Sequence, residues 1–380
     1  MSADEHHDDQ EAIDNEGDEH SEPVAPLSVA QIEEFWQEFV PQLPELAALP
    51  AREFVERANE LLQPFAAGLA LELEHSTDGT NSLLVATAHG SIEQFENVLA
   101  LVRHAPQIPG YRLQAFRSRA LGSDFSMGMD GFSLACSDVL VGHYDAVGVV
   151  GLELTFEKII APDMLAHAQH MAFIMLDHVL GEWDFAVRVG PVEFVEAFSE
   201  EVAGAEPLSV FPPIFDAFIR NDLGRSYQFP SEEQDRWVML EARAQNAAAG
   251  AAPDLLSFRL GANALATRAD LCYFLQLRYG FDSQQDLDQV RDAHDALGDE
   301  LERLHAGLMV FTRVEQMSSR VAAYYVENAE AAQQLAQRIS AEYAPLLGAE
   351  ITIAFDPGWE EYLALYNAIN RNRHDEEGSE

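Results

Sequence analysis

The stretch VAAYYVENAEAAQQLAQRISAEYAPLLGAEITIAF, from Val321 to Phe355, contains the pattern that decides the fold. Its first and last segments, VAAYYV and AEITIAF, are rich in β-branched and aromatic residues and predict strands. Between them, Asn328 is suited to cap a helix. The apolar side of that helix would carry Ala332, Leu335, Ala336, Ile339 and Tyr343. The stretch therefore predicts a strand–helix–strand unit with a right-handed crossover and a helix over one face of a sheet.

The same pattern occurs in the first half of the chain, from Leu83 to Phe116. LLVATAHG and PGYRLQAF predict strands, and SIEQFENVLALVRHA predicts a helix in which Ser91 and Gln94 form a capping box. Both units end in Ala-Phe. We therefore expect an α+β protein of two sandwich-like domains. Each would have a mostly antiparallel sheet, helices covering one face, and a ferredoxin-like element.

Composition sets the expected limits of these domains. Residues 1–27 are rich in Asp, Glu and His and poor in large apolar residues, which predicts a disordered acidic arm. Residues 199–212 are rich in Pro, Gly and Ala and form the expected linker. It would separate an N-terminal α+β domain, 28–198, from a C-terminal α+β domain, 213–370. A short tail, 371–380, would follow.

The charge of the chain restricts its partners. There are 65 Asp plus Glu against 22 Lys plus Arg, so the formal net charge is −43. Such a polyanion repels phosphate backbones and anionic membrane surfaces, so we expect neither nucleic acid nor membrane as a partner. Three explanations remain open: solubility alone, steering of a basic protein partner onto the surface, and adaptation to high salt.

The apolar residues and the cysteines indicate a compartment. No apolar run approaches the length of a membrane span, and the chain does not begin with a basic-then-apolar signal segment. Cys136 and Cys272 lie far apart in apolar, strand-like contexts, which favours two buried free thiols in a reducing environment. A disulfide between them is the alternative. We expect a cytoplasmic protein.

Part of the sequence resembles known bacterial families. WVMLEAR…PDLLSFRL, YFLQLRYGF, LMVFTRVEQMSSRVAAYYV and DPGWEEY, within Arg236 to Tyr366, resemble in their order the domain of unknown function 695. That family commonly has a small, basic hairpin turn, where this chain has Met317, Ser318, Ser319 and Arg320. PGYRLQAFR and MLDHVLGEWDF, within 29–195, resemble an uncharacterised bacterial module that often adjoins such domains. Neither resemblance implies a catalytic residue.

One predicted helix carries residues that can ligate a metal. In HAQHMAFIMLDHVLGEWD, four side chains fall within about 100° of arc at 3.6 residues per turn. They are His167, His170, Asp177 and His178. Such a set can bind zinc, but the glutamate of a His-Glu-x-x-His helix is missing and the rest of the helix is apolar. Histidines and an aspartate at a packed edge are the favoured interpretation, and we predict neither metal nor cofactor.

A second set could support nucleophilic catalysis. Cys136, Asp138 and His143 follow one another in GFSLACSD and the next strand, but a thiol nucleophile needs an adjacent base and a lowered pKa. Sequence proximity alone does not provide these, and the chain has no Gly-x-Ser-x-Gly elbow or phosphate-binding glycine loop. We therefore predict no catalytic residue.

The last segment, AFDPGWEEYLALY, carries aromatic residues at helical spacing. Trp359, Tyr362 and Tyr366 share one face of a helix expected to follow Pro357. Either this face packs on the sheet, or it is a partner-binding face ringed by acids.

Charge and motifs together predict a non-catalytic, acidic protein-binding or inhibitory module, immunity-like or nuclease-regulator-like, acting on a basic protein. Two alternatives remain. One is an enzyme with a site in the interdomain cleft, formed by His178, Asp177 or Cys136. The other is a structural domain protein without activity of its own. The sequence does not indicate an oligomeric state.

Overall fold

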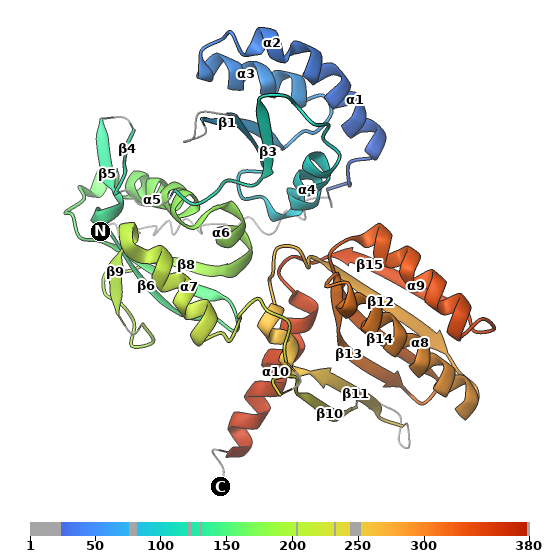
Figure 1. Cartoon of the computed structure of the whole chain (residues 1–380). Helices are drawn as coiled ribbons and strands as arrows, with labels where there is room; N and C mark the ends of the chain where they lie inside the picture. Colours follow the sequence, from blue (N-terminus) through green and yellow to red (C-terminus); the bar gives the residue numbers. More distant parts are fainter. Residues whose placement is uncertain are drawn as a thin grey trace, which may run out of the picture.

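The computed structural model describes residues 24–75, 82–120, 124–129, 131–202, 204–231, 233–243 and 252–377. Most of the acidic arm expected over 1–27 lies outside them. The described chain is α+β, with mostly antiparallel sheets. Figure 1 shows three bodies. We call them the N-terminal unit (24–116), the middle unit (124–227) and the C-terminal unit (228–377). Among the described residues, none of the helices has both the length and the apolar character to cross a bilayer.

The N-terminal unit packs helices against a small mixed sheet. The helices are α1 (Val29–Phe39), α2 (Leu43–Leu46), α3 (Ala51–Leu62) and α4 (Phe95–Arg103). The strands are β1 (Ala70–His75), β2 (Ser82–Thr87) and β3 (Tyr111–Ala115). β2 is antiparallel to β1 and parallel to β3, so β2, α4 and β3 form the predicted crossover unit. The capping box predicted at Ser91 and Gln94 is wrong, because a 3₁₀ turn, η2 (Ile92–Gln94), precedes α4 and the Ser91 hydroxyl donates to Glu93 instead.

The middle unit has a core of its own. Its four-stranded sheet has the order β8-β7-β6-β9, and a β4–β5 hairpin lies beside it. The strands are β4 (Ser126–Met129), β5 (Phe132–Ala135), β6 (Val139–Asp145), β7 (Val150–Phe156), β8 (Val189–Phe194) and β9 (Ala205–Pro207). The helices are α5 (Leu165–Leu180), α6 (Glu182–Arg188) and α7 (Phe211–Asn221). Apolar side chains from α5, α7, β6 and β7 fill the core.

Described residues of the segment 199–212, which was expected to be a linker, pack in the middle unit instead. Its strand β9 pairs with β6, and Leu208 and Phe211 are fully buried in the core of the middle unit. α7 joins the same core through Phe215 and Ile219, although it was expected to lie in the C-terminal domain. Prolines at the first turn begin this helix, and phenylalanines at helical spacing give it an apolar face. The proline content therefore marks a helix start here.

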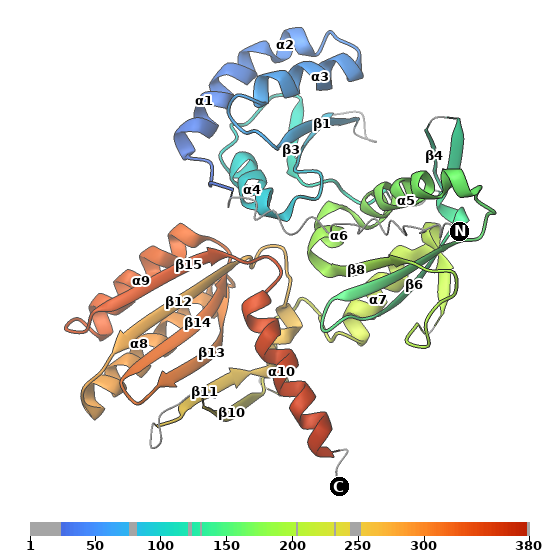
Figure 2. The same cartoon turned by 180° about the vertical axis from the view of Figure 1, so that it is seen from behind.

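The C-terminal unit is built on a six-stranded, fully antiparallel sheet of order β10-β11-β13-β14-β12-β15. The strands are β10 (Trp237–Ala242), β11 (Asp254–Arg259), β12 (Tyr273–Gly280), β13 (Gly307–Glu315), β14 (Ser319–Val326) and β15 (Ala349–Phe355). The helices are α8 (Gln284–Arg303), α9 (Ala329–Tyr343) and α10 (Glu360–Glu377). α8 and α9 lie side by side over one face (Figure 2). α10 and a 3₁₀ segment, η6 (Leu260–Leu265), pack on the other.

The central strands of this sheet are buried on both faces. In β14, Tyr324 points to the face under α8, where its hydroxyl donates to the carbonyl of His294 at 2.8 Å. The next residue, Tyr325, points to the opposite face, where it stacks on Trp359. This alternation explains why VAAYYV is apolar without interruption. α10 continues through Glu377, so the segment predicted as a tail from residue 371 begins inside a helix.

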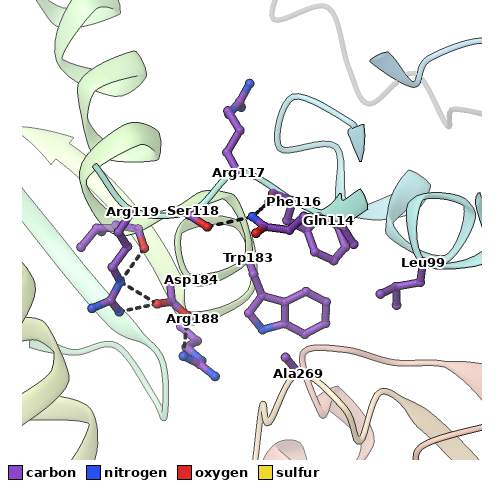
Figure 3. A pocket seen from close by; sticks show the side chains of 13 residues that line it. Leu99, Gln114, Phe116, Arg117, Ser118, Arg119, Trp183, Asp184, Arg188 and Ala269 are labelled. Carbon is purple, nitrogen blue, oxygen red and sulfur yellow. Dashed lines mark hydrogen bonds and ion pairs between the residues drawn. The ribbon is translucent and has the colours of Figure 1, made fainter. Parts of the chain in front are cut away.

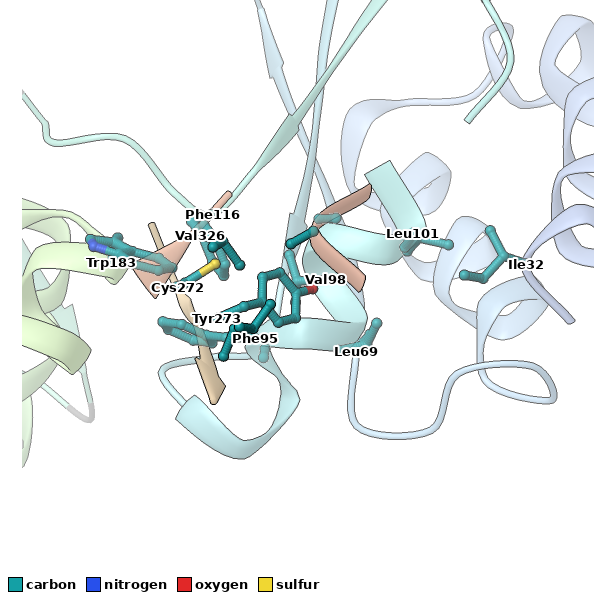
Figure 4. Packing of buried hydrophobic residues seen from close by; sticks show 14 of the residues in the cluster. Ile32, Leu69, Phe95, Val98, Leu101, Phe116, Trp183, Cys272, Tyr273 and Val326 are labelled. Atoms are coloured by element: carbon teal, nitrogen blue, oxygen red, sulfur yellow. The ribbon is translucent and has the colours of Figure 1, made fainter. Parts of the chain in front are cut away.

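One hydrophobic cluster joins all three units (Figure 4). Phe95 of α4 and Phe116 lie against Trp183 of the middle unit, with ring centroids 5.7 and 5.2 Å from the indole. Cys272 and Tyr273 from the C-terminal unit belong to the same cluster. Two separate domains were expected, but the N-terminal unit shares its core with the face of the C-terminal sheet that α8 and α9 cover.

Candidate functional site

The outer face of α8 carries a continuous row of carboxylates, which we call the acidic stripe. Its members are Asp288, Asp292, Asp295 and Asp299, and all four are exposed. Their spacing of four, three and four residues places them within roughly 60° of arc on the helix. The stripe lies opposite the buried side of α8, which packs on the sheet. The fold therefore fixes where these charges point.

The stripe has little internal compensation. Arg291 reaches Asp288 at 3.4 Å, and both side chains are about half exposed, so this pair is weak. The pKa of Asp295 is raised from its ordinary value, first because the carboxyl is partly desolvated and then by repulsion from Asp299 and Asp292, with Arg320 opposing the shift. A cation placed on the stripe would relieve this repulsion. The stripe was missed at the sequence level, although Asp at 4-3-4 spacing on a predicted helix could have shown it.

The aromatic face predicted for partner binding is part of the core at two of its three residues. The Trp359 indole is fully buried, stacks on Tyr325 with centroids 3.8 Å apart, and donates to the carbonyl of Leu271 at 2.7 Å. Tyr362 is also fully buried and stacks on Phe258. Of the two alternatives for this face, packing on the sheet therefore holds for Trp359 and Tyr362, because the second face of the sheet needs a cover and these rings provide it.

Tyr366, the third aromatic residue, has a different position. Its ring is half-buried and stacks on Tyr362 with centroids 5.7 Å apart. It also lines a pocket between α10 and the middle unit. Of the three predicted residues, only Tyr366 therefore borders open space.

Cys136, Asp138 and His143 do not form a nucleophilic site. Burial, with repulsion from Asp124, raises the pKa of the Cys136 thiol to about 12, so the thiol stays protonated at neutral pH. Asp138 accepts the backbone N–H of Ala135 at 2.9 Å and acts as a local cap. His143 lies between phenylalanine rings, and burial lowers its pKa.

The histidine-rich helix is a packed helix. Asp177 forms an ion pair with Arg117 at 2.5 Å, while His167 and His178 contact phenylalanine edges. His170 is exposed. Within the described ranges, no three His, Cys, Asp or Glu side chains are grouped as a metal ion would need.

A pocket of about 460 Å³ lies where the three units meet (Figure 3). Leu99 and Phe116 of the N-terminal unit and Ala269 of the C-terminal unit surround the Trp183 ring, which gives the pocket a mostly apolar character. Cys136, Asp177 and His178 do not line it. The version of the enzyme hypothesis that needs these three side chains in the interdomain cleft therefore gains no support.

The polar groups near this pocket are already paired with one another. Arg119 pairs with Asp184 and, at 2.8 Å, with Asp216, so its charge is already matched. Beside the pocket, the fully buried carboxylate of Glu182 accepts four hydrogen bonds. The donors are the Thr87 hydroxyl (2.8 Å) and the backbone N–H groups of Ala88 (3.0 Å), Gly90 (3.1 Å) and Arg117 (3.1 Å). Glu182 thus ties α6 to the loop after β2.

A scan against protein-family models finds no match to this chain, and neither does a search of curated proteins or of solved structures. The resemblance to the domain of unknown function 695 stays a prediction.

Proposed function

We propose that this chain is a non-catalytic, acidic protein-binding or inhibitory module that acts on a basic protein, in the manner of an immunity protein or a nuclease regulator. The acidic stripe on α8 is the observation that carries the proposal. It presents four exposed carboxylates on a rigid helix in a chain of net charge −43. Such a surface speeds the encounter with a cationic partner and orients it on contact.

The rest of the proposal follows from the same charge. A partner held on α8 would be covered at the basic surface that meets the stripe, which is how binding would inhibit it. Nucleic acid and anionic membranes are disfavoured because the protein's field repels them. We also assign the protein to the cytoplasm, since both cysteines are free and buried, which suits a reducing compartment.

The test is affinity capture with the full chain as bait, at low and at high salt, followed by identification of the eluted proteins. In the stripe variant, Asp288→Asn, Asp292→Asn, Asp295→Asn and Asp299→Asn are combined. The matched control combines Glu33→Gln, Glu34→Gln, Glu38→Gln and Glu45→Gln on α1 and α2, where all four side chains are exposed. Both variants lose four charges, so they differ only in where the charge was removed.

We expect a basic protein that binds the natural chain and the control, is released by salt, and binds the stripe variant roughly tenfold or more weakly. Equal capture by both variants would show that only the overall charge matters. If no basic protein is retained at low salt, the proposed function is wrong. Denaturation of each variant checks that the substitutions leave the fold intact.

A further inference from the structure

Arg225 is a buried cation that forms no ion pair with any residue the structure describes. Its side chain is 1% exposed, and within the described ranges no carboxylate lies at ion-pair distance from it. Its guanidinium donates to the carbonyl of Gly148 and, at 3.4 Å, to the Thr267 hydroxyl, while Nε has no partner among the described residues. Burial lowers its pKa and the like charge of Arg188 adds to this, while Tyr227, Asp145 and Tyr366 oppose the shift. Proteins rarely bury an arginine unpaired, because its desolvation then has no compensation.

Arg225 lines a pocket of about 510 Å³ between the middle unit and α10. A Cβ atom built on Gly148 would lie 3.6 Å from Nη2 of Arg225 and 3.2 Å from the amide nitrogen of Asn367. The Arg225 guanidinium, the Asn367 amide and Gly148 therefore lie together at one place on the pocket wall. Gly148 has φ +88°, a conformation that glycine adopts at little cost, so its backbone turns without adding a side chain there.

The pocket carries both signs of charge. Arg371 of α10 is its second cation, and Asp145 and Asp222 are its acids. One oxygen of Asp145 accepts the backbone N–H of Gly148 at 2.6 Å. The exposed carboxylate of Asp222 has no hydrogen-bond or ion-pair partner among the described residues. A multiply charged anion such as a nucleotide would be repelled by these two acids, whereas a ligand with one positive and one negative group meets a counter-charge for each.

Neutral hydrogen-bonding groups complete the wall. Asn263, Asn367 and Asn370 present amides, and Tyr366 presents its ring. Two of the amides already brace the units: Asn263 donates to the carbonyl of Leu223 at 2.8 Å, and Asn367 to that of Val147 at 2.7 Å. Their remaining oxygens and the Asn370 amide are suited to a small polar ligand.

We propose that this pocket binds a free α-amino acid, with the ligand carboxylate on Arg225 and its ammonium group on Asp145 and Asp222. Arginine matches a carboxylate through two parallel N–H groups, which supplies both energy and orientation. The ligand would pair a buried charge that has no carboxylate partner among the described residues. Because the wall comes from the middle unit and from α10, the bound amino acid would also connect these two units. This inference is independent of the acidic stripe.

The experiment titrates the full-length protein with each proteinogenic amino acid by calorimetry, at millimolar ligand concentration. For any amino acid that binds, its N-acetyl and carboxamide derivatives are tested next. We expect at least one amino acid to bind, and both derivatives to lose binding by about tenfold or more, since each lacks one of the two charges. If no amino acid binds, or if the N-acetyl derivative binds as well as the free ligand, the proposal is overturned.

Variants locate the site. Arg225→Lys keeps the charge but loses the paired N–H groups, and should weaken binding by about tenfold. Asp222→Asn should also weaken it, and because Asp222 is exposed this variant is expected to fold even if the arginine variant does not. Arg220→Gln, at an exposed position of α7 outside the pocket, is the control and should bind normally. Undiminished binding by Asp222→Asn would overturn the assignment.

Discussion

The two strand–helix–strand units share a sequence pattern but differ in how they are built. In the first, β2 and β3 are neighbours and α4 bridges them directly. In the second, β14 and β15 run in the same direction but are separated by β12, which pairs with both. The pattern therefore specifies a crossover without specifying which strand lies between its ends. In the second unit that place is filled by a strand from much earlier in the chain.

The units also differ in what completes them. In the second, residues of the C-terminal unit cover both faces of the sheet: α8 and α9 cover one face, and Trp359 and Tyr362 cover the other. The first has a three-stranded sheet and depends on outside residues, namely Glu182 and Trp183 of the middle unit and Tyr273 of the C-terminal unit. A small unit gains stability by sharing a core, because a small unit folded on its own buries a smaller fraction of its surface than a large one does.

The largest expected effect is on the C-terminal unit. Trp359→Ala removes a fully buried indole, its stack on Tyr325 and its hydrogen bond to Leu271. We expect the free energy of unfolding to fall by about 3–5 kcal/mol. Urea denaturation followed by circular dichroism measures this. Trp237→Ala, at a tryptophan that is 41% exposed on the edge strand β10, is the matched control and should cost much less. A similar small loss at both positions would show that Trp359 does not close the unit.

A smaller loss of stability should appear in the N-terminal unit when Glu182 of the middle unit is changed. The Glu182 carboxylate only accepts hydrogen bonds, and it receives four of them. In Glu182→Gln, the NH₂ group of the new amide would face some of the same N–H and O–H donors and could not accept from them. We expect a loss of about 1–3 kcal/mol. Faster amide hydrogen exchange should appear in the loop after β2 and in β3, more than in the C-terminal sheet.

Glu33→Gln, at an exposed position of α1, serves as the control for this change. If hydrogen exchange in the loop after β2 and in β3 were unaltered by Glu182→Gln, the N-terminal unit would not depend on its neighbour in the way that the buried carboxylate indicates.

The smallest effect concerns an ion pair inside the C-terminal unit. Glu315 accepts from both terminal nitrogens of Arg278 and, at 3.0 Å, from the Ser319 hydroxyl. Burial alone would raise its pKa, but these bonds outweigh it and leave the pKa below the ordinary 4.5. Because the pKa is lower in the folded chain, the carboxylate stabilises the protein above pH 4.5, and that contribution disappears as the pH falls through the folded pKa.

Glu315→Gln should therefore cost about 1 kcal/mol at neutral pH. The difference from the natural chain should shrink as the pH falls below 4.5. Urea midpoints measured across this range test the expectation. A difference that stays constant with pH would mean that the substitution acts through shape and not through charge.

Several features could be predicted from the sequence because they depend on local pattern. The α+β class follows from segments whose periodicity changes between strand and helix, as in 321–355. Asn328 caps α9 as predicted, accepting the N–H of Ala331 at 2.9 Å. Ser91 does not cap its helix, because the chain there first makes a 3₁₀ turn. Capping depends on the backbone geometry at the helix start, and sequence spacing alone does not fix that geometry.

The positions of candidate functional residues were less predictable. The spacing of Tyr362 and Tyr366 correctly placed both in α10, whereas Trp359 precedes that helix with φ +58°. Whether these rings were covered depended on the sheet opposite them. Arg225 gave no signal in the sequence, since an arginine near a helix end is normally solvated. Only its burial beside Gly148 and Thr267 distinguishes it from the other arginines.

The sequence by itself determined the net charge, the fold class, and most of the strands and helices, because these follow from composition and from apolar periods along the chain. Tertiary structure alone decided which strand separates β14 from β15, that 199–212 belongs to a core, and that the N-terminal unit shares its core with the C-terminal sheet. Those outcomes depend on contacts between residues far apart in sequence. Such contacts form where apolar area and buried polar groups from different segments complete one another, and no local pattern records that fit.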